Sequence, residues 1–320
     1  MTSGEIMKQR TEGGQGRYRR TVLATCCIPW NADWTLAENL FRDSIRQLID
    51  RGQRDLYVFG TAGEGYAVSD RLFDQIAQVF ADETTGRGAV PMVGIISLSL
   101  RTVVERIERT AALGVREFQI SLPSWGTLSN SEVAVFFREV CDRFPELQFL
   151  HYNVPRTGRV LTGAEYVPLI EAHPNLVATK QVGTDIRAIH ELMATGGPVR
   201  HFFTDFGFAH ASLLGEPGLL MATSAANPSR AQEFFAAGVR RDADALVAWQ
   251  REIAAVRNLL VSSVGPSAHM DGARDKMHSK LLDPRFPLRL LPPYQGATEA
   301  AFERYQSGLR QVLPHWLSGQ

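Results

Sequence analysis

Eight short apolar runs mark the first two thirds of the chain, and each is followed by a stretch with helical periodicity. In those stretches apolar residues recur three or four positions apart, as in Ile45, Leu48 and Ile49. The runs span Val22 to Ile28, Leu56 to Phe59, Met92 to Ile96, Glu117 to Leu122, Gln148 to Tyr152, Leu176 to Lys180, Val199 to Thr204 and Gly218 to Ala222. This pattern predicts β-strands that alternate with α-helices.

Eight such units are the number expected of a (β/α)8 TIM barrel, an α/β fold. A doubly wound open sheet is the competing architecture, but it usually has fewer strands, and no G-x-G-x-x-G follows the first run. From Ser229 onward only helices are expected, over Ala231 to Gly238, Ala243 to Leu260 and Glu299 to Leu317. We therefore predict a barrel over residues 20–228, a helical C-terminal extension over 229–320, and a polar, disordered arm over 1–19.

The composition is that of a soluble globular protein, with 44% hydrophobic and 21% charged residues. The formal net charge is zero, and no basic stripe for nucleic acid or polybasic segment for a membrane is visible. No apolar stretch approaches the ~18 residues of a membrane span. Three cysteines cannot form a disulfide framework, which predicts a reducing, cytoplasmic setting.

Lysine is rare in this chain, since only four of the 34 basic residues are lysines and Lys180 is the only one between residues 9 and 275. Arginine can replace lysine where a surface charge is enough, but it cannot lose its proton and attack a carbonyl group. Lys180 also ends an apolar run that starts at Leu176. Composition alone leaves two interpretations open, a nucleophile or a surface charge at the end of a strand.

Reactive side chains of a TIM barrel gather where its strands end, and several candidates fall at such positions. Tyr152 ends the fifth predicted strand, so it should face Lys180 on the neighbouring sixth strand. The turn Gly60 to Gly65 follows the second strand without the Lys-Ser/Thr of a P-loop, and its backbone N–H groups could bind a carboxylate. Asp205, after the seventh strand, reads as a helix cap in preference to a pocket residue.

Three segments in this order resemble the dihydrodipicolinate synthase / N-acetylneuraminate lyase family of class I aldolases and lyases. They are the G-[ST]-T-G-E turn, here Gly60 to Glu64, the Y-N-V-P-x-R-T-G segment, here Tyr152 to Gly158, and the strand-borne lysine, here Lys180. The resemblance runs from Thr21 to Leu317. It implies a TIM barrel with a helical C-terminal part, usually a homotetramer, in which the lysine forms a Schiff base with pyruvate or another 2-oxo acid.

The resemblance also implies roles for individual residues. Lys180 is the expected nucleophile, Tyr152 the proton shuttle, and Thr61 the third catalytic residue. Gly60 and Ala62, with Thr61, are expected to line the carboxylate pocket, and Ala222, at the end of the eighth predicted strand, completes the substrate-binding set. No metal or cofactor is expected, because the iminium is itself the electron sink.

Lys180 must lose its proton to react, and an ordinary lysine with a pKa of ~10.4 is almost fully protonated at neutral pH. Burial in a barrel mouth without a nearby carboxylate would lower that pKa, and a shift of ~3 units corresponds to ~4 kcal/mol. The sequence therefore predicts a lowered pKa for Lys180.

Four positions depart from the family pattern. Ala62 replaces a threonine whose hydroxyl binds the substrate carboxylate, and Gln181 replaces a glutamate. Trp125 lies in the region of the synthase T-P-Y-Y pattern and cannot relay a proton. The segment that carries Arg156 is one residue short, so Arg156 is either a ligand for the second substrate's carboxylate or a surface arginine.

These departures argue against dihydrodipicolinate synthase itself and favour a larger or more apolar second substrate, an aldehyde or a sugar acid, held near Trp125. The reaction could be aldol cleavage, condensation or dehydration, in a homo-oligomer that is a tetramer or a dimer. A catalytically weakened member that binds a 2-oxo acid as a sensor is the alternative. A phosphosugar isomerase is disfavoured, because no late glycine-rich phosphate site is evident.

Overall fold

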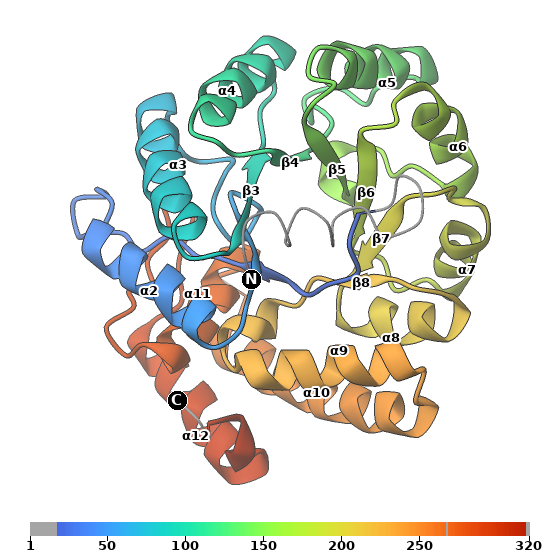
Figure 1. Ribbon diagram of the computed structural model, residues 1–320. Helices are drawn as coiled ribbons and strands as arrows, with labels where there is room; N and C mark the ends of the chain where they lie inside the picture. The colour runs from blue at the N-terminus through green and yellow to red at the C-terminus, as the bar shows by residue number, and fades with distance from the viewer. Residues whose placement is uncertain (1–17, 267, 318–320) are drawn as a thin grey trace.

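The computed structural model describes residues 18–266 and 268–317, and its centre is a parallel sheet of eight strands in the order β1 to β8. The strands are β1 Leu23–Thr25, β2 Asp55–Val58, β3 Val90–Ile95, β4 Glu117–Ile120, β5 Gln148–Asn153, β6 Leu176–Gln181, β7 Arg200–Phe203 and β8 Gly218–Leu219. A parallel bridge between Val22 and Leu219 joins the last strand to the segment before the first. The sheet thus closes into the predicted TIM barrel, and all eight predicted strands are present (Figure 1).

A helix follows every strand, and three further helices complete the described chain. The helices are α2 Glu38–Asp50, α3 Asp70–Thr85, α4 Leu100–Ala112, α5 Asn130–Phe137, α6 Gly163–Ala172, α7 Ile186–Thr195, α8 Asp205–Leu214, α9 Pro228–Arg240, α10 Ala243–Val264, α11 Asp271–Leu282 and α12 Glu299–Val312. Helices α2 to α9 surround the barrel, and α10 packs against α8, α9, α11 and α12 (Figure 1). The division of the chain at residue 228 stays a prediction.

The strands alternate between two apolar cores, as the period of two in a β-strand requires. Outward-facing residues such as Val93 and Phe118 pack against the helices. Inward-facing residues such as Met92, Leu150 and Phe202 fill the barrel interior. Tyr152 and Lys180 are partners in the register of β5 and β6, beyond an irregularity between Phe149 and Leu150, so their side chains point to the same side of the sheet.

The end of the barrel where the strands begin is closed by a buried polar cluster. The Tyr18 hydroxyl donates a hydrogen bond to Glu117 at 2.5 Å, and Arg19 forms ion pairs with Asp55 and Glu117. Asp55 and Glu117 are the first residues of β2 and β4, so the cluster links strands across the barrel. Residues 1–17 of the predicted N-terminal arm lie outside the described part of the chain.

Helix α11 is the main element that the sequence did not predict. It lies between the helices predicted over Ala243 to Leu260 and Glu299 to Leu317, where no helix was expected. The structure explains why the sequence shows no apolar stripe here. Helix α11 is buried on most of its circumference, and most of its buried residues are small or polar. Its buried residues are Gly272, Ala273, Asp275, Lys276, Met277, His278, Ser279 and Leu281.

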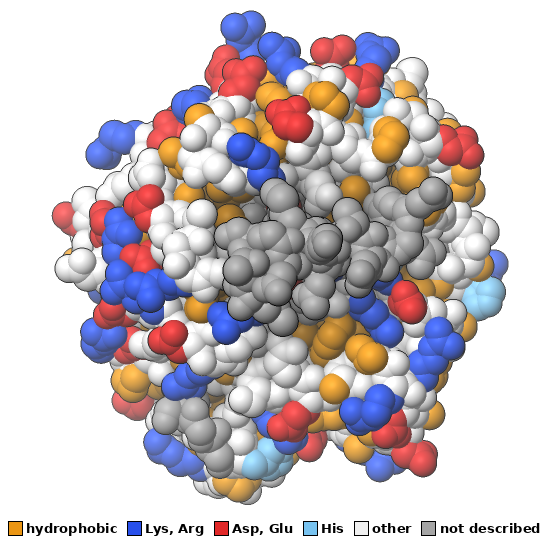
Figure 2. Space-filling model, in the orientation of Figure 1, with side chains coloured by type: hydrophobic (Ala, Val, Ile, Leu, Met, Phe, Trp, Pro, Cys, Tyr) orange, Lys and Arg blue, Asp and Glu red, His pale blue; other side chains and the backbone are white. Residues whose placement is uncertain are grey.

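The surface is mixed in charge. On the face shown in Figure 2, basic and acidic side chains alternate around the rim and no broad region carries one sign. Of the helices that the structure describes, none is both long enough and apolar enough to cross a membrane. Within residues 18–266 and 268–317, no three His, Cys, Asp or Glu side chains are grouped as metal ligands.

Candidate active site

Lys180 lies at the centre of a group of tyrosines where β5 and β6 end. It pairs with Tyr152 in the register of these strands, as predicted, and only 4% of the residue is exposed. Its Nζ lies 4.1 Å from the centre of the Tyr152 ring and donates a hydrogen bond of 3.3 Å to the Tyr57 hydroxyl. The lysine is therefore a buried amine between two phenols.

Tyr57 was missed in the sequence because it reads as an ordinary core aromatic of β2. The useful signal was its position in the inward–outward alternation of the strand. Tyr57 and Met92 are paired on β2 and β3, and both face the barrel interior with Leu150. The inward positions of a barrel whose strands are known therefore include Tyr57. Which inward residue contacts Lys180 depends on barrel geometry that a single sequence does not specify.

Thr61 and Tyr152 form a second contact at the site. Thr61 Oγ1 lies 3.0 Å from the Tyr152 hydroxyl, and either group can donate the hydrogen bond. Both residues are at least 95% buried, so the pair is shielded from bulk water. A threonine and a tyrosine joined in this way can pass a proton in either direction.

The glycine turn is rigid for packing reasons. A Cβ on Gly60 would lie 2.5 Å from the Tyr57 ring, and one on Gly63 would lie 2.6 Å from the Phe59 backbone nitrogen. Gly60 thus supports Tyr57 from behind and does not line the cavity, whereas Thr61 and Ala62 do. The turn fixes Thr61 and Ala62 through the close approach of these backbones.

Glu64 anchors the same turn from inside the protein. Its carboxylate accepts hydrogen bonds from Trp30 Nε1 at 2.8 Å and from the Leu291 backbone at 2.6 Å, and it forms an ion pair of 2.5 Å with Lys276 of α11. Glu64 and Lys276 are both fully buried. This buried pair joins the glycine turn to the helix on the other side of the site.

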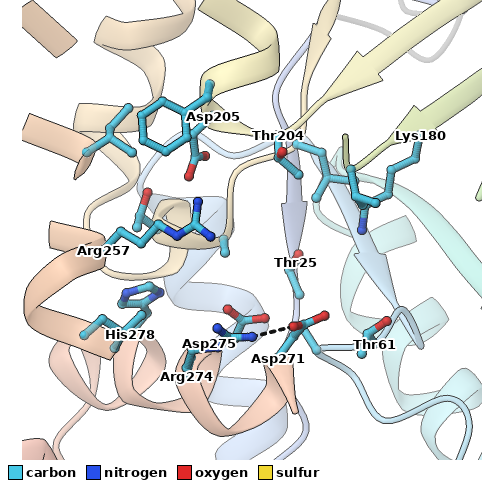
Figure 3. A pocket seen from close by; sticks show the side chains of 18 of the residues that line it. Thr25, Thr61, Lys180, Thr204, Asp205, Arg257, Asp271, Arg274, Asp275 and His278 are labelled. Atoms are coloured by element: carbon cyan, nitrogen blue, oxygen red, sulfur yellow. Dashed lines mark hydrogen bonds and ion pairs between the residues drawn. The ribbon is translucent and has the colours of Figure 1, made fainter. Parts of the chain in front are cut away.

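Above Lys180 is a cavity of about 380 Å³, large enough for a small organic substrate. Strand ends and loops of the barrel form one wall, and helices α8, α10 and α11 form the other (Figure 3). The polar and charged residues that line it are Thr25, Tyr57, Thr61, Tyr152, Lys180, Thr184, Thr204, Asp205, Thr223, Arg257, Asp271, Arg274, Asp275 and His278. Ala222 lines the cavity as well.

Burial and the neighbouring phenols act in opposite directions on the pKa of Lys180. Burial disfavours the ammonium form, but negative charge on Tyr152 and Tyr57 favours it, and together they raise the pKa of Lys180 above its ordinary value. Burial also raises the pKa of Tyr57, against the opposing effect of Lys180. The predicted lowering was therefore wrong, because it considered burial alone. A proton must therefore leave Lys180 before its amine can attack a carbonyl carbon.

Two predicted site residues lie away from the cavity. Arg156 is tied to Asp271 by hydrogen bonds of 3.0 and 3.4 Å, its side chain is 52% exposed, and it does not line the cavity. Trp125 is 90% exposed in the loop after β4. Trp125 does not line the cavity of the single chain, and its contact with a second substrate stays a prediction.

Helix α11 contributes four cavity residues that the sequence did not suggest. Asp271, Arg274, Asp275 and His278 are spaced three, one and three positions apart, so they share one face of the helix. Arg274 donates a hydrogen bond of 2.7 Å to Asp271. Burial raises the pKa of Asp275 to about 7 and lowers the pKa of His278 to about 4, so His278 is neutral.

Asp205 also faces the cavity, in contrast to its interpretation as a helix cap. The N-cap of α8 is Thr204, and Asp205 is the first residue of the helix. Its Oδ1 is buried without a hydrogen-bond partner, and burial raises its pKa to about 6. The acid is therefore held in the cavity wall by α8.

The fold and the site define a class of protein: a TIM barrel with a buried lysine on its sixth strand, beside tyrosines, under a polar cavity. The model of the dihydrodipicolinate synthetase family matches residues 19–273 of this chain. The chain therefore belongs to that family, which comprises class I Schiff-base lyases.

Individual relatives are distant in sequence. The chain is 28% identical over 242 residues to 4-hydroxy-tetrahydrodipicolinate synthase of Xanthomonas axonopodis pv. citri, an alignment that covers 74% of this chain and 78% of the relative. It is 25% identical over 271 residues to the protein of the same name from Exiguobacterium sibiricum, covering 84% and 90%. These values leave the particular reaction open.

Solved structures share the fold at lower identity. YagE, a prophage protein of the dihydrodipicolinic acid synthase family from E. coli K12 solved in complex with pyruvate, has a TM-score of 0.82 and 18% identity, covering 91% of this chain and 98% of its own. N-acetylneuraminate lyase of Proteus mirabilis has a TM-score of 0.79 and 17% identity, covering 92% and 98%.

Proposed function

We propose that this protein is a lyase that forms a Schiff base between Lys180 and pyruvate or another 2-oxo acid. The observation that carries the proposal is the position of Lys180 Nζ, buried 3.3 Å from the Tyr57 hydroxyl and against the Tyr152 ring at the base of the cavity. Pyruvate bound to the structural relative YagE supports the choice of a 2-oxo acid.

In the proposed reaction, neutral Lys180 attacks the 2-oxo carbon and gives a carbinolamine. Tyr152 donates a proton to the carbinolamine hydroxyl, which leaves as water, and the nitrogen lone pair forms the iminium. Thr61 stabilises the resulting Tyr152 phenolate through their hydrogen bond of 3.0 Å, and the phenolate is the base for the next step. In cleavage, the phenolate takes the proton of the C4 hydroxyl, the C3–C4 bond breaks, and its electron pair passes to the iminium to give an enamine and an aldehyde. In condensation, the phenolate takes a proton from C3, and the enamine attacks an aldehyde whose oxygen then receives that proton.

The substrate carboxylate is placed at the turn that carries Thr61 and Ala62. The backbone N–H groups of this turn are the proposed donors to the carboxylate, since Ala62 has no hydroxyl. A missing hydrogen bond to a charged group is worth ~1.5–3 kcal/mol, which the remaining turn donors offset only in part. Ala222 borders the same cavity and belongs to the proposed substrate-binding set.

The second substrate is proposed to differ from that of dihydrodipicolinate synthase, although the curated relatives carry that enzyme's name. The support comes from Arg156, which is held by Asp271 outside the cavity. Aldol cleavage, condensation and dehydration all begin with the same imine, and the proposal covers the three. The larger or more apolar second substrate near Trp125 stays a prediction, and the exposed side chain is free to make that contact.

Borohydride reduction in the presence of pyruvate, followed by peptide mass mapping, tests the proposal. We expect one stable adduct on the peptide that contains Lys180, and none in Lys180→Arg, whose fold is checked by circular dichroism. Absence of an adduct with pyruvate and other 2-oxo acids would overturn the proposal. An adduct without turnover on a panel of aldehydes and sugar acids would favour a 2-oxo acid-binding sensor.

The proposal retains two expectations from the sequence. A homo-oligomer, dimer or tetramer, is supported by Trp125 and Leu98, which are 90% and 58% exposed after neighbouring strands β4 and β3. Sedimentation velocity of the wild type would measure it. The cytoplasmic setting rests on the three cysteines, all of which are free and buried.

A further inference from the structure

Asp275 of helix α11 is a buried acid that nothing in the proposed imine chemistry uses. Only 8% of the residue is exposed, and it lines the cavity. Its carboxyl group makes no hydrogen bond or ion pair with any residue of 18–266 or 268–317. Because the carboxyl group faces the cavity, its donor has to come from water or from a ligand in that cavity. Such a group is expected to have its donor supplied by a ligand.

The other acid on this face of α11, Asp271, has hydrogen-bond partners within the protein. Asp271 is bound by Arg156 at 3.0 Å and by Arg274 at 2.7 Å, and these cations lower its pKa. Asp275 is one position beyond Arg274 and shares none of these bonds. The two aspartates therefore differ in kind: Asp271 belongs to an ion-pair network, and Asp275 is left facing the cavity.

The position of Asp275 selects one part of the substrate. Lys180 lies on one side of Thr25, and Asp275 lies on the other side, toward Arg257 and His278 (Figure 3). The 2-oxo acid occupies the Lys180 side, because its carbonyl carbon bonds to Nζ. The chain that extends away from the new carbon–carbon bond is then expected in the part of the cavity that Thr25 and Asp275 line.

The charges around the cavity decide what kind of donor fits there. Three acidic side chains line it, from Asp205, Asp271 and Asp275, and three basic side chains line it as well, from Lys180, Arg257 and Arg274. A cationic ligand would add a positive charge to a wall that already carries Arg257 and Arg274. A neutral donor, the hydroxyl group, satisfies the Asp275 oxygens without that penalty.

We propose that Asp275 is a specificity-determining residue that accepts a hydrogen bond from a hydroxyl group on the distal carbon chain of the second substrate. The inference rests on the proposed Schiff-base function and adds to it a residue that selects the second substrate by hydrogen bonding. Asp205 Oδ1, which is buried without a partner in the same cavity, leaves room for a second hydroxyl nearby. Substrates of this kind are hydroxylated chains, and alkyl or aryl chains would leave Asp275 unsatisfied.

The test uses enzyme with pyruvate trapped on Lys180 by borohydride, so that the inner half of the cavity is filled and turnover is not needed. Binding of erythritol is compared with that of 1,4-butanediol, which has the same carbon chain and two fewer hydroxyl groups, by NMR saturation transfer titration. Wild type, Asp275→Asn and Asp275→Leu are measured, with Asp244→Asn as the control for an exposed aspartate on α10.

Wild type and Asp244→Asn are expected to bind erythritol at least about 10-fold more tightly than butanediol, as a hydrogen bond to a charged group allows. Asp275→Asn should reduce that preference, and Asp275→Leu should abolish it. Equal binding of both ligands by wild type, or an unchanged preference in both Asp275 variants, would overturn the inference. Failure to trap pyruvate on Lys180 would instead overturn the proposed function, so the two failures are distinguishable. Circular dichroism of the Asp275 variants shows that they fold.

Discussion

At the residue scale, the site is a set of polar side chains in contact. Lys180 Nζ contacts the Tyr57 hydroxyl and the Tyr152 ring, and Tyr152 is hydrogen-bonded to Thr61. Burial disfavours the charged form of Lys180, whereas its neighbouring phenols favour that form. The chemistry of the amine then depends on its tyrosines as much as on its own burial.

Tyr152→Phe tests the shuttle directly. The change removes one hydroxyl and keeps the ring against Lys180, so we expect the rate of imine formation with pyruvate to fall about 10²- to 10³-fold, as for other proton-transfer groups. Stopped-flow trapping with borohydride gives this rate. Thr61→Val removes only the hydrogen-bond partner of Tyr152, so the rate of imine formation should fall by about 10-fold in this variant. A Tyr152→Phe rate within about 3-fold of wild type would exclude the shuttle role.

Asp275 should also leave a signature in stability. Its pKa in the folded protein is raised from 3.8 to about 7, so between these values the folded state binds more protons than the unfolded state. Stability from this group is therefore present at low pH and is lost as pH rises through that window, by up to about 4 kcal/mol. Asp275→Asn should melt close to wild type at pH 4 and several degrees above it at pH 8.

Differential scanning fluorimetry over that pH range measures the effect, with Asp244→Asn as the control. A melting difference that does not grow with pH would show that Asp275 is paired or hydrated in solution. A stabilising substitution at a cavity residue is what a trade-off between function and stability predicts.

The residues at the site show what one sequence can reveal. Lys180, Tyr152 and Thr61 were predictable, because their chemistry belongs to the residue type and their positions follow from strand ends. Tyr57 and Asp275 were not, since an inward-facing phenol and a buried acid acquire a role only through what they face. Arg156 shows the opposite case: the residue type suited a carboxylate, but Asp271 holds it outside the cavity.

At the element scale, the strands were predictable and α11 was not. Strands of a parallel barrel are covered on both faces and read as continuous apolar runs. Helix α11 buries polar side chains such as Asp275 and Lys276, so its sequence lacks the apolar stripe from which a helix is predicted. Much of the cavity wall opposite Lys180 therefore came from an element without a sequence signal.

The ion pair of Lys276 with Glu64 is expected to fasten α11 to the glycine turn. Lys276→Met leaves a buried carboxylate without its countercharge, which should lower the free energy of unfolding by about 3–5 kcal/mol. Adding Glu64→Gln to that variant should restore part of the loss, because the amide oxygen can still accept from Trp30. Thermal denaturation followed by circular dichroism measures both. A double variant less stable than Lys276→Met alone would contradict this account.

At the scale of the whole molecule, the two ends of the barrel have different tasks. The site lies where the strands end, and the cluster of Arg19 with Asp55 and Glu117 lies where they begin. In TIM barrels the end where the strands finish carries the active site, and the end where they begin contributes to stability. The structure thus predicts that damage to one end spares the other.

Arg19→Ala tests this separation. The substitution removes the cation shared by two carboxylates that are at least 93% buried on their side chains, so we expect a loss of about 2–4 kcal/mol in thermal or urea unfolding. Arg101→Ala, from an exposed ion pair with Glu105, should change stability by less than about 1 kcal/mol. Pyruvate trapping on Lys180 should match wild type in both variants below their melting temperatures. A folded Arg19→Ala protein that no longer forms the adduct would show that the ends are coupled, because a rigid barrel would then transmit the disturbance along its strands to Lys180.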